Sequence, residues 1–181
     1  MKGLIVFSTN MEDVEALGTR ALLRRAGIDM HSVTFENSKE INTAFKQKVI
    51  VDYLMDEIDF DTYDFIVIPG GKYVSQIVDQ DVNIKHVATQ FYQKNKLVAA
   101  ICAGPRFLGQ AGILDGKSFT AYKGSEIDMS KGLYLPHKKA VRDQNIITAR
   151  GAGAIYEFAY EIVRYLFDEN KANSLLENIL F

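Results

Sequence analysis

The single cysteine of the chain, Cys102, lies in a segment of mostly small side chains that reads Ala99-Ala100-Ile101-Cys102-Ala103-Gly104-Pro105. An apolar run ends just before it, and Pro105 suits the first turn of a helix. The segment therefore predicts a sharp turn from a strand into a helix, similar to the nucleophile turn of hydrolases. Backbone N–H groups at the start of that helix would point at the sulfur and lower the pKa of the thiol. We predict that Cys102 is a nucleophile, and the alternative is a small buried core residue.

A second group that could take part in chemistry is Glu15, in the first turns of a helix expected over residues 12–26. An acidic residue at that place also favours the helix dipole without any further role. The helix follows the first expected strand, however, so its start borders the same edge of the sheet as Cys102, and Gly18 would let another backbone approach closely. A carboxyl group held neutral there could donate a hydrogen bond to a thiolate and carry a proton.

The third feature is the pair Gly70 and Gly71, which follows Pro69 at the end of the apolar run from Phe65 to Ile68. Such a segment can be a simple turn. Beside a nucleophile, its backbone N–H groups could instead stabilise a negatively charged oxygen.

Two other glycine-containing segments resemble phosphate-binding loops without matching them. Gly116-Lys117-Ser118 has Ala111 at the position of the first required glycine, and a strand rather than a helix is expected after it. Gly151-Ala152-Gly153 has Tyr156 in place of the third glycine of a dinucleotide-binding fingerprint. We therefore predict neither a nucleotide nor a dinucleotide site.

The histidines give little support for a metal site. His31, His86 and His137 are far apart in the sequence, and none forms a ligand pair with Cys102. We predict no metal site, and only His137, in an expected loop, remains a weak candidate for the functional site.

Composition indicates one ordinary globular domain. The 181 residues are 48% hydrophobic and 24% charged, and the formal net charge is −2, so nothing indicates nucleic-acid binding. No segment reaches the length of about 18 apolar residues that would cross a bilayer, and no polybasic membrane anchor is present. With one cysteine no internal disulfide can form, which favours a reducing cytoplasm.

The expected elements alternate between strands and helices. The strands cover residues 4–7, 31–35, 65–68, 97–101, 118–121 and 145–148, and the helices cover residues 12–26, 82–94, 105–111 and 155–167, with a short helix at the C-terminus. Residues 36–48 are expected as a loop, with a short edge ribbon near residues 49–51. The alternation predicts a three-layer α/β fold with a mainly parallel central sheet, in a single domain over residues 1–181. Ligands bind beyond the carboxyl ends of such strands, where the loops after Phe7, Ile68 and Ile101 meet.

With these residues in place, the sequence resembles the ThiJ/PfpI superfamily, and most closely its DJ-1-like branch. The resemblance covers nearly the whole chain and rests on residues 69–71, 99–105 and 148–153, with matching spacing over residues 15–28. It implies a flavodoxin-like α/β sandwich, a homodimer and no cofactor.

The resemblance also implies roles for individual residues. In such proteins the cysteine of the turn is an acidic, oxidation-prone thiol that hydrogen-bonds a protonated glutamate, here Glu15. The amides of Gly71 and Ala103 would form the oxyanion site, while Arg25 and Arg150 match basic positions near it. Activities of the family include glyoxalase and deglycase chemistry on methylglyoxal and its adducts, oxidative-stress sensing and chaperone-like behaviour.

The sequence departs from the family pattern in two places. Family proteases have a histidine directly after the cysteine, where this chain has Ala103, so protease activity is disfavoured. The DJ-1-like branch has a histidine after the strand that matches residues 118–121, and here Tyr122 aligns near that position. A phenol with a pKa near 10 is a poor base at neutral pH, so proton transfer would fall to Glu15.

Two functions follow as hypotheses. In the first, the Cys102 thiolate attacks a small α-oxoaldehyde, and Glu15 carries the protons that turn it into a hydroxy acid. In the second, the protein is an oxidative-stress sensor whose Cys102 stops at sulfenic or sulfinic acid without significant turnover. Hydrolysis or amide transfer on another substrate ranks third, because no positioned histidine is identified.

Overall fold

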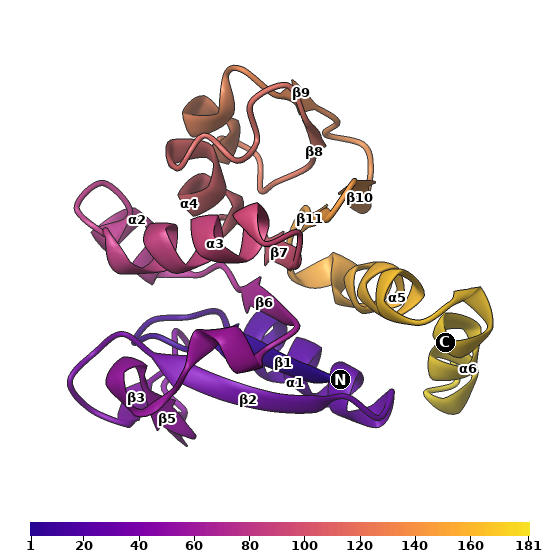
Figure 1. The fold of residues 1–181 in the computed structure, drawn as a ribbon, viewed down its shortest axis with the longest axis horizontal. Coiled ribbons are helices and arrows are strands. Elements are labelled where there is room, and N and C mark those ends of the chain that lie inside the picture. Colours follow the sequence, from indigo (N-terminus) through magenta and orange to yellow (C-terminus); the bar gives the residue numbers. More distant parts are fainter.

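A seven-stranded sheet forms the centre of the computed structural model, which describes residues 1–181 (Figure 1). The strand order is β10-β11-β7-β6-β1-β2-β5. The parallel strands are β1 (Lys2–Val6), β2 (Asp29–Thr34), β5 (Tyr53–Leu54), β6 (Phe65–Ile68), β7 (Leu97–Ile101) and β11 (Ile146–Ala149), while β10 (Ala140–Asp143) pairs antiparallel with β11. Strands β6, β7 and β11 are buried along their whole length, which explains why they read as continuous apolar runs.

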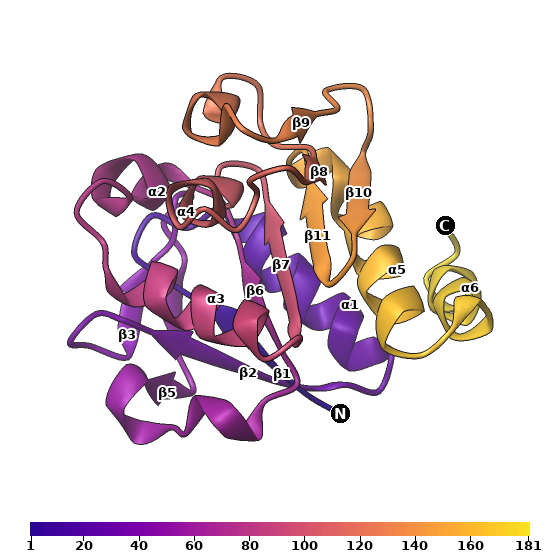
Figure 2. The same ribbon diagram turned by 45° about the horizontal axis from the view of Figure 1, so that its top comes forward.

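Helices cover both faces of this sheet (Figure 2). On one face, a π-helical turn (Val14–Gly18) leads into α1 (Thr19–Arg25), and α1 packs against α5 (Ile155–Leu166). On the other face lie α3 (Asn83–Gln93) and α4 (Pro105–Gln110), which pack against each other. The connection from β1 to β2 runs in one direction across the sheet, and the connection from β6 to β7 runs in the opposite direction. Because both crossovers are right-handed, the helices of these two connections lie on opposite faces of the sheet. The reversal between β1 and β6 is the switch point at which such folds bind ligands.

The smaller elements surround this frame. They are the hairpin of β3 (Glu40–Asn42) and β4 (Lys48–Ile50), the parallel pair β8 (Ser118–Phe119) and β9 (Leu133–Tyr134), the helices α2 (Lys72–Ile77) and α6 (Glu169–Asn178), and short 3-10 turns at Met55–Glu57, Phe60–Thr62, Ser125–Met129 and Ala152–Ala154. A cluster of 49 buried hydrophobic residues lies between the sheet and its helices, so one continuous core supports all the strands that carry the site. No helix of the structure combines the length and the apolar character needed to cross a membrane.

The predicted α/β architecture with a mainly parallel sheet is confirmed, and four local differences stand out. Residues 118–121 do not join the central sheet, because β8 pairs only with β9. The expected loop at residues 36–48 contains the first strand of a hairpin. Helix α2, which directly follows the turn at Gly70 and Gly71, was not predicted. Strand β10 was not predicted either, since it is an edge strand with exposed positions and lacks an apolar run.

Candidate active site

Cys102 occupies the turn between β7 and α4 in a left-handed backbone conformation, with φ +63°. A residue with a Cβ pays about 1–3 kcal/mol for such a conformation. Two hydrogen bonds hold it: the Cys102 N–H donates to the Ala149 carbonyl at 2.8 Å, and the Cys102 carbonyl accepts from the Tyr122 N–H at 2.8 Å. The half-buried side chain therefore stands on a fixed, sharp turn, as the small residues around it predict.

Glu15 lies opposite, inside the π-helical turn that precedes α1, and it is only 1% exposed. Single π-helical turns are rare and are frequent at functional sites. The Gly70 N–H donates to Glu15 Oε2 at 3.0 Å, and the Ala152 N–H also binds the carboxyl group. The Cys102 side chain lies within hydrogen-bonding reach of the same carboxyl group. The predicted partnership of Glu15 and Cys102 is therefore present in the geometry.

A closed ring of hydrogen bonds fixes this carboxyl group. The Glu15 N–H donates to Glu12 Oε2 at 2.7 Å, and the Glu12 N–H donates to the Gly70 carbonyl at 3.0 Å. The Gly70 N–H completes the ring on Glu15 Oε2. The loop after β1 and the loop after β6 therefore hold each other through these three residues.

Burial dominates the electrostatics of Glu15. Desolvation raises the pKa of its carboxyl group from 4.5 to about 7, and the nearby charge of Glu12 adds to this. The hydrogen bonds from Cys102, Gly70 and Ala152 favour the ionised form and act in the opposite direction. Glu15 therefore changes its charge near neutral pH, where a proton carrier works best.

The thiol departs from the prediction made from its turn. Burial raises the pKa of Cys102 above its ordinary value, and the charge and hydrogen bond of Glu15 raise it further, while the Ala103 N–H lowers it. The prediction of a lowered thiol pKa was wrong because desolvation and a neighbouring carboxylate outweigh the helix terminus. The thiolate becomes accessible only when Glu15 holds the proton, so the two groups titrate as a pair.

The glycines allow the loops to approach the pair. A Cβ built on Gly70 would lie 2.6 Å from Cys102 Cβ, 2.6 Å from Glu15 Oε2 and 3.0 Å from the Ala103 nitrogen. Gly71 has φ +126° and packs against the backbone of residues 10–12. Neither the Gly71 N–H nor the Ala103 N–H donates to a protein oxygen. The Ala103 N–H hydrogen-bonds the Cys102 side chain, so the Gly71 N–H is the one of the two that has no partner.

Replacing Gly70 by alanine should therefore destabilise the protein and disrupt the pair. Its backbone is not left-handed, so the effect comes only from the methyl group that collides with Cys102 and Glu15. We expect a loss of about 1–3 kcal/mol in the free energy of unfolding, as for other overpacked sites, measured by denaturant titration. Gly153→Ala is the matched control, because a Cβ there meets nothing within 4 Å. Equal stability of the two variants would contradict the close approach.

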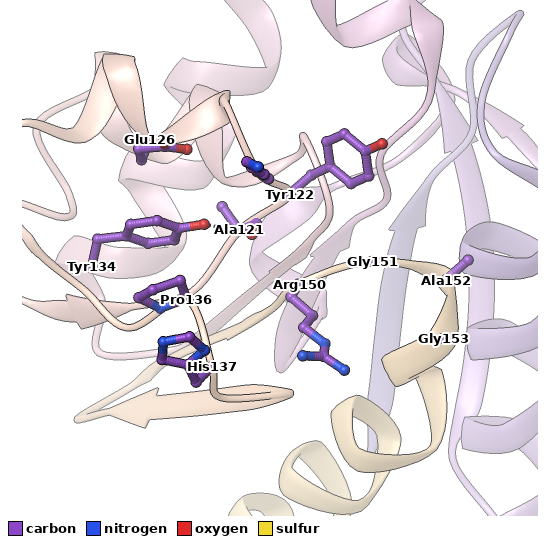
Figure 3. A pocket seen from close by; sticks show the side chains of 11 residues that line it. Ala121, Tyr122, Glu126, Tyr134, Pro136, His137, Arg150, Gly151, Ala152 and Gly153 are labelled. Atoms are coloured by element: carbon purple, nitrogen blue, oxygen red, sulfur yellow. Dashed lines mark hydrogen bonds between the residues drawn. The ribbon is translucent and has the colours of Figure 1, made fainter.

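An open cavity of about 750 Å³ lies among the loops after β8, β9 and β11 (Figure 3). Tyr122, His137 and Arg150 line it together with the Gly151–Gly153 segment. A Cβ built on Gly151 would lie 3.7 Å from the Tyr122 ring and 4.0 Å from Glu15 Oε1, so this segment joins the cavity to the pair. The structure therefore places the weak candidate His137 in the same cavity wall as Tyr122 and Arg150.

Arg25 does not belong to this group. It lies in the last turn of α1, exposed, in a separate apolar groove with Tyr156 and the C-terminal residues 179–181. Glu15 is at the other end of the same helical segment, about 15 Å away at 1.5 Å per residue. Within one chain Arg25 therefore lies in a different groove from the residues around Cys102, and a role for Arg25 near the site stays a prediction.

Sequence reasoning missed two groups that contact Glu15. Glu12 read as one of several acidic residues at a helix start, and only its position three residues before Glu15 hinted at a capping role. Ala152 was considered in a rejected dinucleotide motif and in the segment that carries the family resemblance, but not as a contact of Glu15. The Ala152 contact depends on tertiary packing, whereas the Glu12 contact lies within one helical turn.

Replacing Glu12 by glutamine should shift the titration of the pair to lower pH. The amide oxygen can still accept the Glu15 N–H, but the negative charge that raises the Glu15 pKa is removed. The pH dependence of Cys102 alkylation by iodoacetamide measures this shift. Glu177→Gln is the control, because it removes the same charge from the remote helix α6. An unchanged inflection in Glu12→Gln would show that Glu12 has no electrostatic influence on the pair.

Comparison with known proteins points in one direction. A model of the DJ-1/PfpI family matches residues 1–165. Protein dj-1beta of Drosophila melanogaster is 28% identical over 178 residues, covering 98% of this chain and 95% of the relative. Deglycase PfpI of Pyrococcus furiosus is 30% identical over 167 residues, covering 92% and 99%. The crystal structure of Drosophila melanogaster DJ-1beta superposes with a TM-score of 0.90 at 28% identity, covering 99% of this chain and 97% of that one.

Proposed function

This chain belongs to the DJ-1/PfpI family, and on that premise we propose that it converts small reactive aldehydes through Cys102, with Glu15 as proton carrier and no cofactor. The observation that carries the proposal is the buried carboxyl group of Glu15, which lies within reach of the sulfur. The pKa of this carboxyl group is raised to about 7. The similarity to a relative named as a deglycase supports the same class of substrate.

In the first proposed step, the ionised Glu15 takes the proton of the Cys102 thiol while the sulfur attacks the aldehyde carbon of an α-oxoaldehyde. A carbon–sulfur bond forms, and the electron pair of the carbonyl moves to its oxygen. The unpaired N–H group of Gly71, together with the N–H group of Ala103, would stabilise that oxygen. A base with a pKa near 7 suits this transfer at neutral pH.

In the second step, Glu15 first gives the thiol proton to the oxygen on the former aldehyde carbon and is ionised again. It then takes the proton from that carbon and delivers it to the neighbouring carbonyl carbon, while the hydroxyl proton of the first carbon passes to the oxygen of the second. The first carbon is oxidised to a thioester and the second is reduced to a carbinol, so no external oxidant or reductant is needed. Water then hydrolyses the thioester, releases a 2-hydroxy acid and restores the thiol. For methylglyoxal the product is lactate.

The test is lactate formation from methylglyoxal by the purified protein without any added cofactor, carried out in deuterium oxide. A proton carried by Glu15 exchanges with solvent, so lactate should contain deuterium at the carbon that bears the hydroxyl group. Lactate without deuterium would exclude Glu15 as the carrier, and absence of lactate would overturn the proposal.

The sensor function has weaker support. Peroxide reacts with thiolate, and the raised pKa of Cys102 reduces the thiolate fraction at neutral pH. A mass gain of two oxygen atoms on Cys102 under mild peroxide, together with no turnover of methylglyoxal, would favour the sensor over the enzyme.

A lone reactive thiol suits a reducing compartment, so we propose a cytoplasmic location for either function.

We also propose that the protein forms a homodimer through the apolar groove beside α1. Tyr156, Leu180 and Phe181 line this groove and are exposed, and the ring centroids of Tyr156 and Phe181 lie 4.8 Å apart with the planes tilted by 33°. Contiguous exposed apolar side chains of this kind mark interaction surfaces. Light scattering should give twice the mass of 20.3 kDa, and Ala21→Glu, which places a charge in the groove, should give monomers. A monomeric wild-type protein would contradict the proposal.

A further inference from the structure

The cavity beside the Cys102–Glu15 pair has an unbalanced set of charges. Lys123 and Arg150 line it with two cations, and Glu126 is its only carboxylate. His137 adds an imidazole to the same wall. The interior of this cavity therefore favours negative charge.

Both cations are unpaired. Neither Lys123 nor Arg150 takes part in any ion pair of the structure, and neither side chain donates a hydrogen bond to the protein. The neighbouring Lys139, by contrast, is bound to Glu157. The Glu126 carboxylate accepts the Gly124 N–H at 2.6 Å, so it braces its own loop and does not neutralise either cation.

Backbone hydrogen bonds tie the residues that precede both cations to Cys102. Arg150 directly follows Ala149, whose carbonyl accepts the Cys102 N–H, and Lys123 directly follows Tyr122, whose N–H binds the Cys102 carbonyl. Each cation is thus one residue away from a direct hydrogen bond to Cys102. Figure 3 shows the Arg150 side chain between His137 and the Gly151–Gly153 segment.

The size of the cavity also favours a ligand larger than methylglyoxal. Cavities of about 300–1,000 Å³ hold ligands of drug size, and this one, at about 750 Å³, is far larger than methylglyoxal requires. The planar guanidinium of Arg150 matches the geometry of carboxylates and phosphates.

We infer, on the basis of the proposed function, that the preferred substrate is an aldehyde bearing an anionic group, a carboxylate or a phosphate, which Arg150 and Lys123 bind while its aldehyde carbon meets Cys102. A suitable probe is 4,5-dioxopentanoate, an α-oxoaldehyde with a carboxylate tail. By the same internal redox steps and the addition of water it yields 2-hydroxyglutarate. The wild-type protein should have a higher kcat/KM for this probe than for methylglyoxal.

Arg150→Gln and Lys123→Gln should lower kcat/KM for the carboxylate probe more than for methylglyoxal, by about tenfold for Arg150, since hydrogen bonds between charged groups are among the stronger ones. Lys138→Gln is the matched control. It removes one positive charge from the loop between β9 and β10, and Lys138 lies outside the cavity lining and forms no ion pair. It should leave the preference between the two substrates unchanged. An unaltered preference in Arg150→Gln would overturn the inference.

A second measurement does not depend on turnover. Iodoacetate and iodoacetamide alkylate the same sulfur, and they differ in charge. The rate ratio of iodoacetate to iodoacetamide should fall by about two- to fivefold in Arg150→Gln, as expected for an exposed charge, and stay constant in Lys138→Gln. If the iodoacetate-to-iodoacetamide ratio falls in Arg150→Gln but the wild type does not turn over methylglyoxal, the anion site stands and the enzyme proposal is rejected. If the ratio stays constant and methylglyoxal is turned over normally, the enzyme proposal stands and the anion site is rejected.

Protection experiments separate the two anionic groups. Inorganic phosphate or acetate is added while iodoacetamide reacts with Cys102, at constant ionic strength. Stronger protection by phosphate assigns a phosphate-bearing substrate, and stronger protection by acetate assigns a carboxylate. Protection that persists undiminished in Arg150→Gln would overturn the inference.

Discussion

Cys102→Ser should lose aldehyde turnover by about a thousandfold or more, because removal of a nucleophile leaves only binding and oxyanion stabilisation. A hydroxyl group has a far higher pKa than a thiol, and a carboxylate with a pKa of about 7 cannot deprotonate it efficiently. The measurement is lactate formation from methylglyoxal by both proteins at equal concentration. Equal rates would exclude Cys102 as the nucleophile.

The control for this variant is structural. Serine has nearly the same size and can adopt the same left-handed backbone, so the fold should be kept, and the midpoint of unfolding tests this. Because Cys102 is the only cysteine, the variant should bind no thiol reagent at all. A folded, thiol-free protein without turnover would assign the loss to the sulfur alone.

Glu15→Gln should lower kcat/KM by about a hundredfold or more, the usual contribution of a positioned general base. Glutamine can still accept the Gly70 N–H, but it cannot take a proton from Cys102. Glu15→Asp keeps the acid but withdraws it by one methylene from Cys102 and Gly70, so its activity should lie between those of wild type and Glu15→Gln. Activity in Glu15→Gln at the wild-type level would reject the proton-carrier role.

The same pair of variants has a pH signature that is independent of turnover. In the wild type, alkylation of Cys102 should rise with an inflection near pH 7, because loss of one proton from the pair gives access to the thiolate. In Glu15→Gln that inflection should disappear, and alkylation should rise only at the higher pH where the buried thiol itself ionises. A wild-type profile without an inflection near pH 7 would contradict the coupling.

The raised pKa of Glu15 also links stability to pH. The unfolded carboxyl group ionises near 4.5, and the folded one near 7, so between these values the folded state holds more protons. Stability should therefore fall as pH rises from about 4.5 to 7, by about 3 kcal/mol for a shift of this size. The burial of a charged carboxylate is the cause. Glu15→Gln should lack this decline when the free energy of unfolding is measured across that range.

The sequence allows much of the site to be predicted where local pattern determines the structure. The small residues around Cys102 require a tight turn, and the apolar run before Gly70 requires a buried strand, so both loops end at the same edge of a parallel sheet. The position of Glu15 follows from the order of the first strand and helix. These inferences depend only on local sequence patterns and on the order of strands and helices.

The remaining features depend on packing between distant segments. The direction of the thiol pKa shift follows from the burial of Cys102 by loops from three strands, which no local pattern reveals. Motif spacing does not say which end of a helix meets a ligand, so the groove that holds Arg25 could not be foreseen from the sequence. Ala152 contacts Glu15 only once the loops after β1 and β11 have met, whereas the Glu12 contact lies within one helical turn.

The buried position of the lone thiol makes it an internal reporter of folding. In the unfolded chain Cys102 is an ordinary cysteine that ionises near pH 8.5. In the folded chain its pKa is raised, because Glu15 and the loops around it enclose the sulfur. These segments are distant in sequence, so a partly folded chain that lacks any of them leaves the thiol in its unfolded chemical environment. The reactivity of one native atom therefore distinguishes completed folding from collapse, without an added label.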